Sequence, residues 1–428
     1  MKPFFILIIA MLVALSGAVA VAADQKPLES LPLLVDAALA NNPALKSSRA
    51  RWHMYLAKAR QSGSLDDPML MFKLQNLLVR EPLSFGGKDP TTAKVIGISQ
   101  QLPFWGKRGL REEVASHEAE AYRFSIDERK LELTQMVKET YYKLYAVDHD
   151  LAIVKKNLRI LQDFTTVAES RYAVGQGAQT DILKAGLERS KLLDLQISLK
   201  QQRISLEAGL NYLLSRPSGT PVGQVPDFTL PQLKQSAAQL MGLAEQHRPQ
   251  LKVLNSQIEK ARAAQKLARK ELWPDFNLSL EYMFRQPAMG DPGYDMFTVG
   301  LTFNLPVQHE RRSAMVAESG SESTMAAEEV SSLRNSIDYT INDSLAQLER
   351  RSRLVELYQR GIIPQAEQTL ESSLINYQVG KVDFSAVLDS RANLFNYERE
   401  LYESKADYMM QLARLEAAVG SDLTPSQK

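Results

Sequence analysis

The sequence predicts a mainly α-helical chain with a β-barrel portion, built from a helix–hairpin–long-helix-pair unit that occurs twice. Three observations predict this fold class. Four segments alternate apolar and polar residues, long helical segments without proline follow them, and the same signals recur in the second half of the chain. The clearest alternation lies at residues 297–305, where apolar residues alternate with Thr, Gly and Asn. This period of two is typical of a β-strand with one apolar face.

The duplication is visible as sequence signals that return in the same order and at a nearly constant offset. The first repeat is expected at residues 24–216 and the second at 231–420. A Pro/Gly-rich linker at 217–230 separates them, and residues 421–428 form a C-terminal tail. The returning signals are Asn42-Pro43 with Arg248-Pro249, Pro68 with Pro274, Gly97 and Leu102-Pro103 with Gly300 and Leu305-Pro306, and Tyr172-x-x-Gly175 with Tyr377-x-x-Gly380.

Each repeat contains a hairpin of two strands followed by two long helices. Apolar residues recur every seven positions within residues 144–161, which indicates a supercoiled helix rather than an isolated amphipathic one. Pro364, close to Gly361, is expected to interrupt the third long helix. The strands are expected at about 69–78, 93–102, 275–284 and 296–305, and the long helices at about 107–171, 181–214, 312–376 and 386–419.

The N-terminus predicts export. Lys2, an apolar run at residues 4–15 and small residues near Ala20 and Ala22 form a cleavable signal peptide, expected at residues 1–23. The chain has no cysteine, so we expect no lipid anchor after cleavage, no disulfide and no thiolate metal site. Past the signal, no apolar run is long enough for a transmembrane helix.

Composition gives no support to an enzyme or a nucleic-acid-binding protein. The formal net charge is +1, whereas a nucleic-acid-binding protein normally has a basic excess. The five histidines are scattered without the spacing of metal ligands, and neither a phosphate-binding loop nor a nucleophile elbow is present. We therefore predict no catalytic residue, no cofactor and no metal site.

The strand faces predict a membrane barrel. Each strand is about ten residues long, which suits a tilted membrane strand, and four strands of one chain cannot close on themselves in lipid. Chains must then pool their strands; two chains would give eight, and three would give twelve with room for water. The residues predicted to face lipid are Leu70, Phe72, Ile96, Ile98, Phe276, Leu278, Leu280, Tyr282, Val299, Leu301 and Phe303.

Taken together, these signals resemble the TolC-type outer-membrane efflux proteins, the outer-membrane components of tripartite pumps. The resemblance rests on the duplication, on Leu102-Pro103 and Leu305-Pro306 at the strand exits, and on the helical turns. The turns are Tyr172-x-x-Gly175 and Tyr377-x-x-Gly380, the second followed after seven residues by Leu388-Asp389. It implies a homotrimer with a twelve-stranded outer-membrane barrel, continued by a periplasmic coiled-coil tunnel of twelve helices. It also implies docking to a periplasmic adaptor protein and an inner-membrane pump of the RND type. The run Asp67-Pro68-Met69-Leu70, together with Gln75-Asn76, is most similar to the heavy-metal branch, which includes copper and cobalt-zinc-cadmium systems.

The resemblance places a gate at the periplasmic mouth of the tunnel. The gate candidates are Tyr172 and Asp181 at the first helical turn and Tyr377 and Asp389 at the second. An alternative for the carboxylates is helix capping and interaction with the helix dipole. Ala386 occupies the position of a second gate carboxylate in the family, which weakens the expectation of two charged rings. The strand-to-helix hinges are expected at Gly97, Leu102, Pro103, Gly300, Leu305 and Pro306.

The predicted function is an exit duct for small molecules or metal cations, in contact with outer-membrane lipid. Met69, Met71, Met283 and Met296 face the predicted lumen; thioethers bind soft metals, but packing is their commoner role, so no metal site is assigned. Two alternatives stay open, namely the exit duct of a type I protein secretion system and a periplasmic coiled-coil scaffold without a pore. A scaffold would leave the four strands unexplained.

Overall fold

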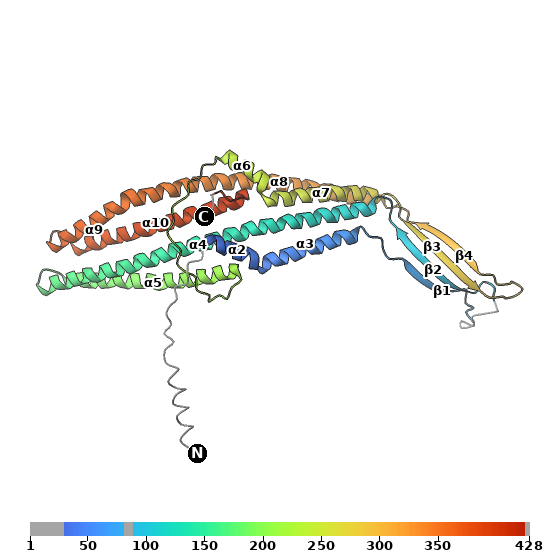
Figure 1. The fold of residues 1–428 in the computed structure, drawn as a ribbon, viewed down its shortest axis with the longest axis horizontal. Coiled ribbons are helices and arrows are strands. Elements are labelled where there is room, and N and C mark those ends of the chain that lie inside the picture. The colour runs from blue at the N-terminus through green and yellow to red at the C-terminus, as the bar shows by residue number, and fades with distance from the viewer. Residues whose placement is uncertain (1–29, 81–88, 424–428) are drawn as a thin grey trace, which may run out of the picture. The chain divides into compact units, whose positions relative to one another are not determined.

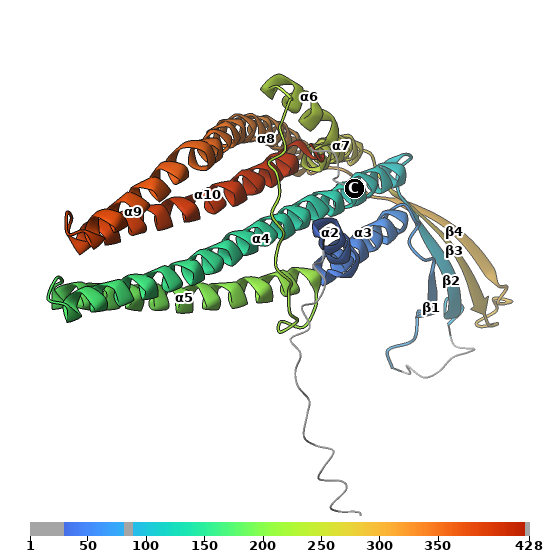
Figure 2. The same cartoon turned by 60° about the vertical axis from the view of Figure 1, so that its left-hand side comes forward.

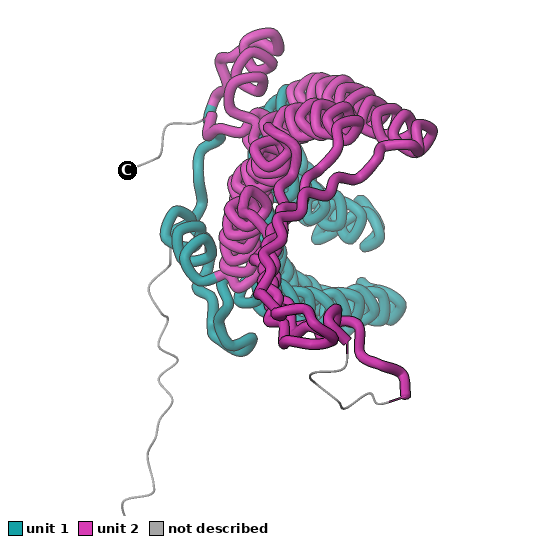
Figure 3. The backbone as a smooth tube through the Cα atoms, turned by 90° about the vertical axis from the view of Figure 1, so that its right-hand side faces the viewer, with its two compact units in different colours: residues 1–41, 134–231, 347–413 teal, residues 42–133, 232–346, 414–428 magenta. Residues whose placement is uncertain are grey.

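The computed structural model of the chain describes residues 30–80 and 89–423. The predicted signal peptide, part of the first hairpin loop and the end of the C-terminal tail lie outside the described residues. Contacts divide the chain into two compact units. Unit 1 comprises residues 1–41, 134–231 and 347–413, and unit 2 comprises residues 42–133, 232–346 and 414–428 (Figure 3). Each unit therefore takes segments from both sequence repeats.

Unit 2 contains an antiparallel sheet in the strand order β1-β2-β3-β4 (Figure 1). Its strands are β1 (Met69–Gln75), β2 (Ala93–Leu102), β3 (Phe276–Arg285) and β4 (Met296–Phe303). β1 ends earlier than expected because Asn76 has a φ of 55° and donates a side-chain hydrogen bond to the Thr91 carbonyl at 3.2 Å. This conformation turns the chain out of the strand.

The strand register gathers most of the large apolar side chains of the sheet on one face. Leu70 lies opposite Ile98, Ile98 opposite Leu280, and Leu280 opposite Val299. Among the residues of this face that were predicted to contact lipid, the exposed fraction runs from 40% for Tyr282 to 70% for Phe72, while Phe276 is half-buried. The face contains every residue predicted to contact lipid: Leu70, Phe72, Ile96, Ile98, Phe276, Leu278, Leu280, Tyr282, Val299, Leu301 and Phe303.

Gly97 and Gly300, expected at strand exits, instead lie inside β2 and β4. A Cβ added at Gly97 would lie 3.1 Å from both Met71 Cε and Glu281 Cγ, and one at Gly300 would lie 2.4 Å from Ser279 Oγ. The two glycines thus leave space for side chains of the neighbouring strands and do not form hinges. Leu102 ends β2, and Pro103, Leu305 and Pro306 lie in the connections to the long helices.

Two of the helices in unit 2 begin with side-chain caps. The helices of this unit are α3 (Pro43–Ser62), α6 (Ala237–His247) and α7 (Pro249–Lys270), together with the first parts of α4 (Lys107–Ala173) and α8 (His309–Leu357). The Asn42 side chain accepts hydrogen bonds from two N–H groups in the first turn of α3, and Ser236 and Gln239 form a capping box at α6. Among the described residues, no helix is both long and apolar enough to span a membrane.

Unit 1 is built from two helical hairpins and α2 (Leu31–Asn41). α5 (Gln179–Leu214) runs back along the second part of α4, and α10 (Phe384–Val419) runs back along α9 (Ile363–Gln378) (Figure 2). The seven-residue pattern places one apolar stripe of each helix in a shared core. This core comprises Ile153, Val154, Leu161 and Phe164 of α4, Ala185, Leu192 and Leu199 of α5, Tyr377 of α9, and Phe384, Val387, Leu388 and Phe395 of α10.

The interruption expected near Pro364 is a π-helical turn, η1 (Tyr358–Ile362), between α8 and α9. The Ile363 N–H donates to the Tyr358 carbonyl, five residues back, and Pro364 follows in the first turn of α9. A proline has no N–H and clashes with the preceding turn, so the wider turn accommodates it without ending the helix. The Tyr358 hydroxyl donates to the Glu400 carboxylate of α10, which anchors this turn.

Candidate functional site

The two helical turns of unit 1 have the same backbone geometry. Gly175 and Gly380 have φ values of 74° and 75°, a conformation that glycine adopts without strain. Their N–H groups donate to the carbonyls of Tyr172 and Tyr377, each at 3.0 Å. The Tyr-x-x-Gly signal of the sequence is therefore a helix C-cap that turns the chain into the returning helix.

Tyr377 joins the two turns. Its side chain is 3% exposed, and its hydroxyl donates a 3.1 Å hydrogen bond to Asp181 in the first turn of α5. Burial, together with the bond to Asp181, raises the pKa of Tyr377 to about 12. The hydroxyl consequently stays protonated at neutral pH and can act as the donor. Tyr172, the counterpart in the first repeat, is 48% exposed.

Arg171 ties the same turns together through backbone carbonyls. Its guanidinium donates to the carbonyls of Tyr377, Gln378 and Gln176, the last two at 2.7 and 2.9 Å. It also lies 4.7 Å from the centre of the Tyr377 ring, within the range of a cation–π contact. Nothing in the sequence pattern points to this role of Arg171. A basic residue in the last turn of a helix ordinarily indicates only a favourable interaction with the helix dipole.

One face of α5 contacts the second helical hairpin through three polar residues, which we call the α5 polar ladder: Asp181, Lys184 and Glu188. Their spacing of three and four residues puts them on the same side of the helix. Lys184 donates to the Ser385 hydroxyl at 2.8 Å, and Glu188 accepts from Arg391 at 3.2 Å. Of these three residues, only Asp181 was predicted from the sequence, because charges on a long helix most often face solvent.

Arg391 is the most enclosed charge of this contact. The residue is 2% exposed, and its Nε and Nη1 atoms have no hydrogen-bond partner among the described residues. Burial lowers the pKa of the Arg391 guanidinium, and Glu188 opposes that effect. An arginine stays charged even so, and Glu188 is its one carboxylate partner in the described part of the chain.

The structure does not bring Asp389 into this contact. Asp389 is exposed and makes no side-chain hydrogen bond or ion pair with the residues that the structure describes. Asp181 is not a capping residue either: the N-cap of α5 is Ala178, which makes no side-chain cap bond. Asp181 therefore combines a favourable position at the helix dipole with a bond between the two hairpins.

The hinge below the sheet, in unit 2, is organised by Lys107. Its side chain is fully buried, and its Nζ atom lies 2.8 Å from Asp275, 3.1 Å from Glu271 and 2.9 Å from the Trp273 carbonyl. Burial raises the pKa of Asp275, but hydrogen bonds from Lys107 and from the Phe104 N–H outweigh it and hold that pKa below its usual value. Lys107 thus links the start of α4 in the first repeat to the end of α7 in the second.

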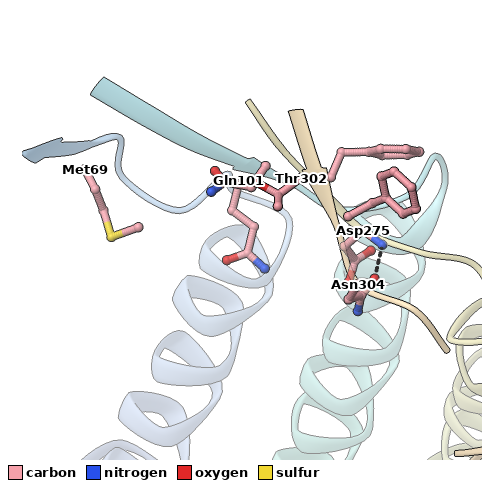
Figure 4. Close-up of a pocket in the computed structure, with 8 residues that line it drawn as sticks. Met69, Gln101, Asp275, Thr302 and Asn304 are labelled. Carbon is pink, nitrogen blue, oxygen red and sulfur yellow. Dashed lines mark hydrogen bonds between the residues drawn. The ribbon is translucent and has the colours of Figure 1, made fainter. Parts of the chain in front are cut away.

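A recess of about 360 Å³ lies beside this hinge, at the base of the sheet (Figure 4). Asp275 lines it, and its N–H donates to the Asn304 side chain at 2.7 Å, which holds the end of β4 against the start of β3. The other polar lining residues include Gln101, Asn277 and Thr302. No group of three His, Asp or Glu residues within the described ranges is arranged to hold a metal ion.

Comparison with known proteins identifies the family. A family model described as "Outer membrane efflux protein" matches residues 34–214 and 240–421. The outer membrane efflux protein BepC of Brucella suis is 22% identical over 390 residues, which cover 89% of this chain and 83% of BepC. The cobalt-zinc-cadmium resistance protein CzcC of Cupriavidus metallidurans is 20% identical over 312 residues, 72% of each chain.

The fold agrees with this assignment. The crystal structure of the outer membrane protein VceC from Vibrio cholerae superposes with a TM-score of 0.76 at 18% identity, covering 92% of this chain and 97% of VceC. This fold and this family are those of channel proteins rather than enzymes. The family match in both repeats, over most of the chain, shows that this chain belongs to the outer membrane efflux protein family and is an efflux duct of the outer membrane.

Proposed function

We propose that three copies of this chain form the duct, with a twelve-stranded barrel continued by a helical tunnel on the periplasmic side. The observation that carries this proposal is the open sheet. β1 and β4 are its edges, and their outer backbone groups pair with no other strand among the described residues. Such edges are not tolerated in lipid, so each must pair with a neighbouring copy. Three copies give twelve strands, enough for a water-filled lumen.

An aromatic cluster supports the membrane position of this sheet. Trp105 and Trp273 are 74% and 55% exposed, and they lie at the ends of the central strands β2 and β3. The Trp105 ring centre lies 5.5 Å from that of Phe276, which belongs to the lipid-facing side of β3. Tryptophans gather where a membrane meets water, so this cluster marks the periplasmic boundary of the hydrocarbon layer.

The contact between the helical hairpins is the proposed gate. The α5 polar ladder holds the two hairpins together through Tyr377, Ser385 and Arg391, and Arg171 fastens the two turns. Opening the mouth would break these bonds while the apolar core between the hairpins moves. Tyr172 and Asp389 are exposed near the same turns and are proposed to line the mouth, where three copies of Asp389 would form a ring of negative charge.

The proposed substrates are small molecules or metal cations, delivered by an inner-membrane pump of the RND type through a periplasmic adaptor. The likeness to CzcC, named for cobalt, zinc and cadmium resistance, supports a metal-exporting system. The chain is proposed to reach the outer membrane through its cleaved signal peptide, without lipidation. Growth of a deletion strain on these metals, on dyes and on detergents would identify the substrate class.

Native mass spectrometry of the detergent-solubilised protein tests the trimer. We expect the mass of three mature chains. A stable monomer or dimer as the dominant species would refute the twelve-stranded barrel. Single-channel recording of the same sample in a planar bilayer should give discrete conductance steps, because a closed barrel encloses water.

A further inference from the structure

The hinge of each repeat contains the same arginine contact, which shows which residues of the two repeats are equivalent. Arg108, at the start of α4, donates to the carbonyl of Gly63, the C-cap of α3, at 3.0 and 2.8 Å. Arg312, at the start of α8, donates to the carbonyl of Glu271, the C-cap of α7, at 2.7 Å. Gly63 therefore corresponds to Glu271 in the duplicated unit.

The strand registers give the same alignment independently. Gly97 and Gly300 correspond in the sequence, and they lie opposite Met71 and Ser279 respectively. Met71 thus corresponds to Ser279. Counting four residues back from this pair, or four forward from Gly63 and Glu271, places Asp67 on Asp275. In this alignment Pro68 and Pro274, which the sequence signals paired, are not equivalent positions: Pro68 corresponds to Phe276, two residues after Pro274.

In this alignment two equivalent contacts are expected, one for each repeat, but only one of them forms within one chain. Lys107 of the first repeat binds Asp275 of the second. The counterpart of Lys107 is Arg311, and the counterpart of Asp275 is Asp67. Both are exposed, and neither makes a side-chain hydrogen bond or ion pair among the described residues. Arg311 follows β4 and Asp67 precedes β1, so the two lie beside the open edges of the sheet.

We propose that Arg311 of one copy pairs with Asp67 of the next copy, repeating between chains the contact that Lys107 and Asp275 make within one. The inference rests on the proposed trimer. Gly63 stands where the second repeat has Glu271, so this position supplies no carboxylate of its own to the proposed pair. An arginine can bind one carboxylate through two parallel hydrogen bonds, which a lysine cannot do.

The same symmetry fixes the register of the strand pair between copies. Within one chain, Ser99 of β2 lies opposite Ser279 of β3. Their counterparts are Thr302 of β4 and Met71 of β1, so Thr302 lies opposite Met71 of the neighbouring copy. Both side chains belong to the polar face of the sheet, which keeps the apolar face continuous around the barrel.

Cysteine cross-linking tests this register cleanly, because the chain has no native cysteine. Oxidation of Thr302→Cys with Met71→Cys should give covalent dimers and trimers on a denaturing gel. The matched control, Ser99→Cys with Ser279→Cys, should lose its thiols to the same extent but run as a monomer. Thr302→Cys with Lys73→Cys represents the register displaced by two residues. The amount of cross-linked product from this variant should stay near that of single-cysteine variants. Stronger cross-linking of that variant would overturn the proposal.

Charge reversal tests the ion pair itself. Arg311→Asp and Asp67→Arg should each lower the association of trimers about tenfold, and the two together should restore most of it. Arg262→Asp, at an exposed arginine of α7 paired within its own helix, controls for a general effect of charge. A combined variant no better than either single variant would overturn the pair. If the wild-type protein itself were not trimeric, the proposed assembly would fail instead, so the two failures are distinguishable.

Discussion

At the scale of single residues, α10 places charges where a coiled coil normally has apolar side chains. Phe384 and Leu412 begin and end a series of positions seven residues apart, and they are 1% and 2% exposed. The three positions of this series between them hold charged residues. Each of them pairs with a different element of unit 1. A charged pair at such a position favours one register over others, because any slip would leave a buried charge alone. The pairs are Arg391 with Glu188 of α5, Glu398 with Lys156 of α4, and Lys405 with Asp227 of the linker.

The pair of Arg391 and Glu188 gives a prediction about single and double substitution. Glu188→Leu alone leaves Arg391 buried without a partner and should destabilise the ends of α5 and α10 by up to ~3 kcal/mol. Replacing both residues by leucine should restore most of that stability. Hydrogen exchange of the amides around Arg391 measures both effects. Equal exchange in the wild type and in Glu188→Leu would show that the pair contributes little.

Asp275 gives a prediction about pH. Its pKa in the folded chain lies below the usual aspartate value, so the unfolded chain binds the proton first as the pH falls. The stability that Asp275 contributes is therefore complete above the usual pKa of an aspartate, about 4, and is lost below it. In Asp275→Asn, the melting temperature of the solubilised protein should be lower than in the wild type at neutral pH. It should also fall less steeply as the pH is lowered. An unchanged slope between pH 6 and pH 3 would contradict this account of the hinge.

At the scale of elements, the sheet makes a prediction about its two faces. Val299 and Thr298 are neighbours in β4, and both are exposed, but they point to opposite faces. Val299→Lys should cost about 2–4 kcal/mol if it lies near the bilayer midplane, whereas Thr298→Lys should cost little because it faces water. The yield of folded trimer in lipid vesicles measures the difference. Equal yields would mean that the apolar face does not contact lipid.

The sequence was sufficient to locate the strands and long helices because both depend on local periodicity. The alternation in residues 297–305 is enough to recognise β4 and its two faces. The sequence could not identify the partners of Lys107, Arg171 or Arg391, since these contacts join residues far apart in the chain. The role of Gly97 was also missed, because a mid-strand glycine becomes informative only when the register shows Met71 and Glu281 packed over it.

At the scale of the whole molecule, the symmetry of the proposed trimer multiplies the small free-energy contributions of single hydrogen bonds. A hydrogen bond to a charged group contributes ~1.5–3 kcal/mol, and a trimer contains each bond three times. The bond between Tyr377 and Asp181 is therefore strong enough, in the proposed assembly, to bias a closed mouth even though one copy of it is weak. This contact belongs to unit 1 and the hinge to unit 2, so we expect changes at the mouth to leave the barrel intact.

This expectation leads to a prediction about conductance. Tyr377→Phe with Asp181→Ala removes the bond between the hairpins while keeping the aromatic ring in its core, so single-channel conductance in planar bilayers should rise. Tyr172→Phe is the matched control, because this tyrosine is exposed and its hydroxyl makes no bond with the described residues; it should conduct like the wild type. Asp389→Ala should leave conductance closer to wild type but weaken block by multivalent cations, because it removes the proposed ring of charge without touching the contact. Unchanged conductance in the Tyr377 and Asp181 variant, with an intact trimer, would place the constriction elsewhere in the tunnel.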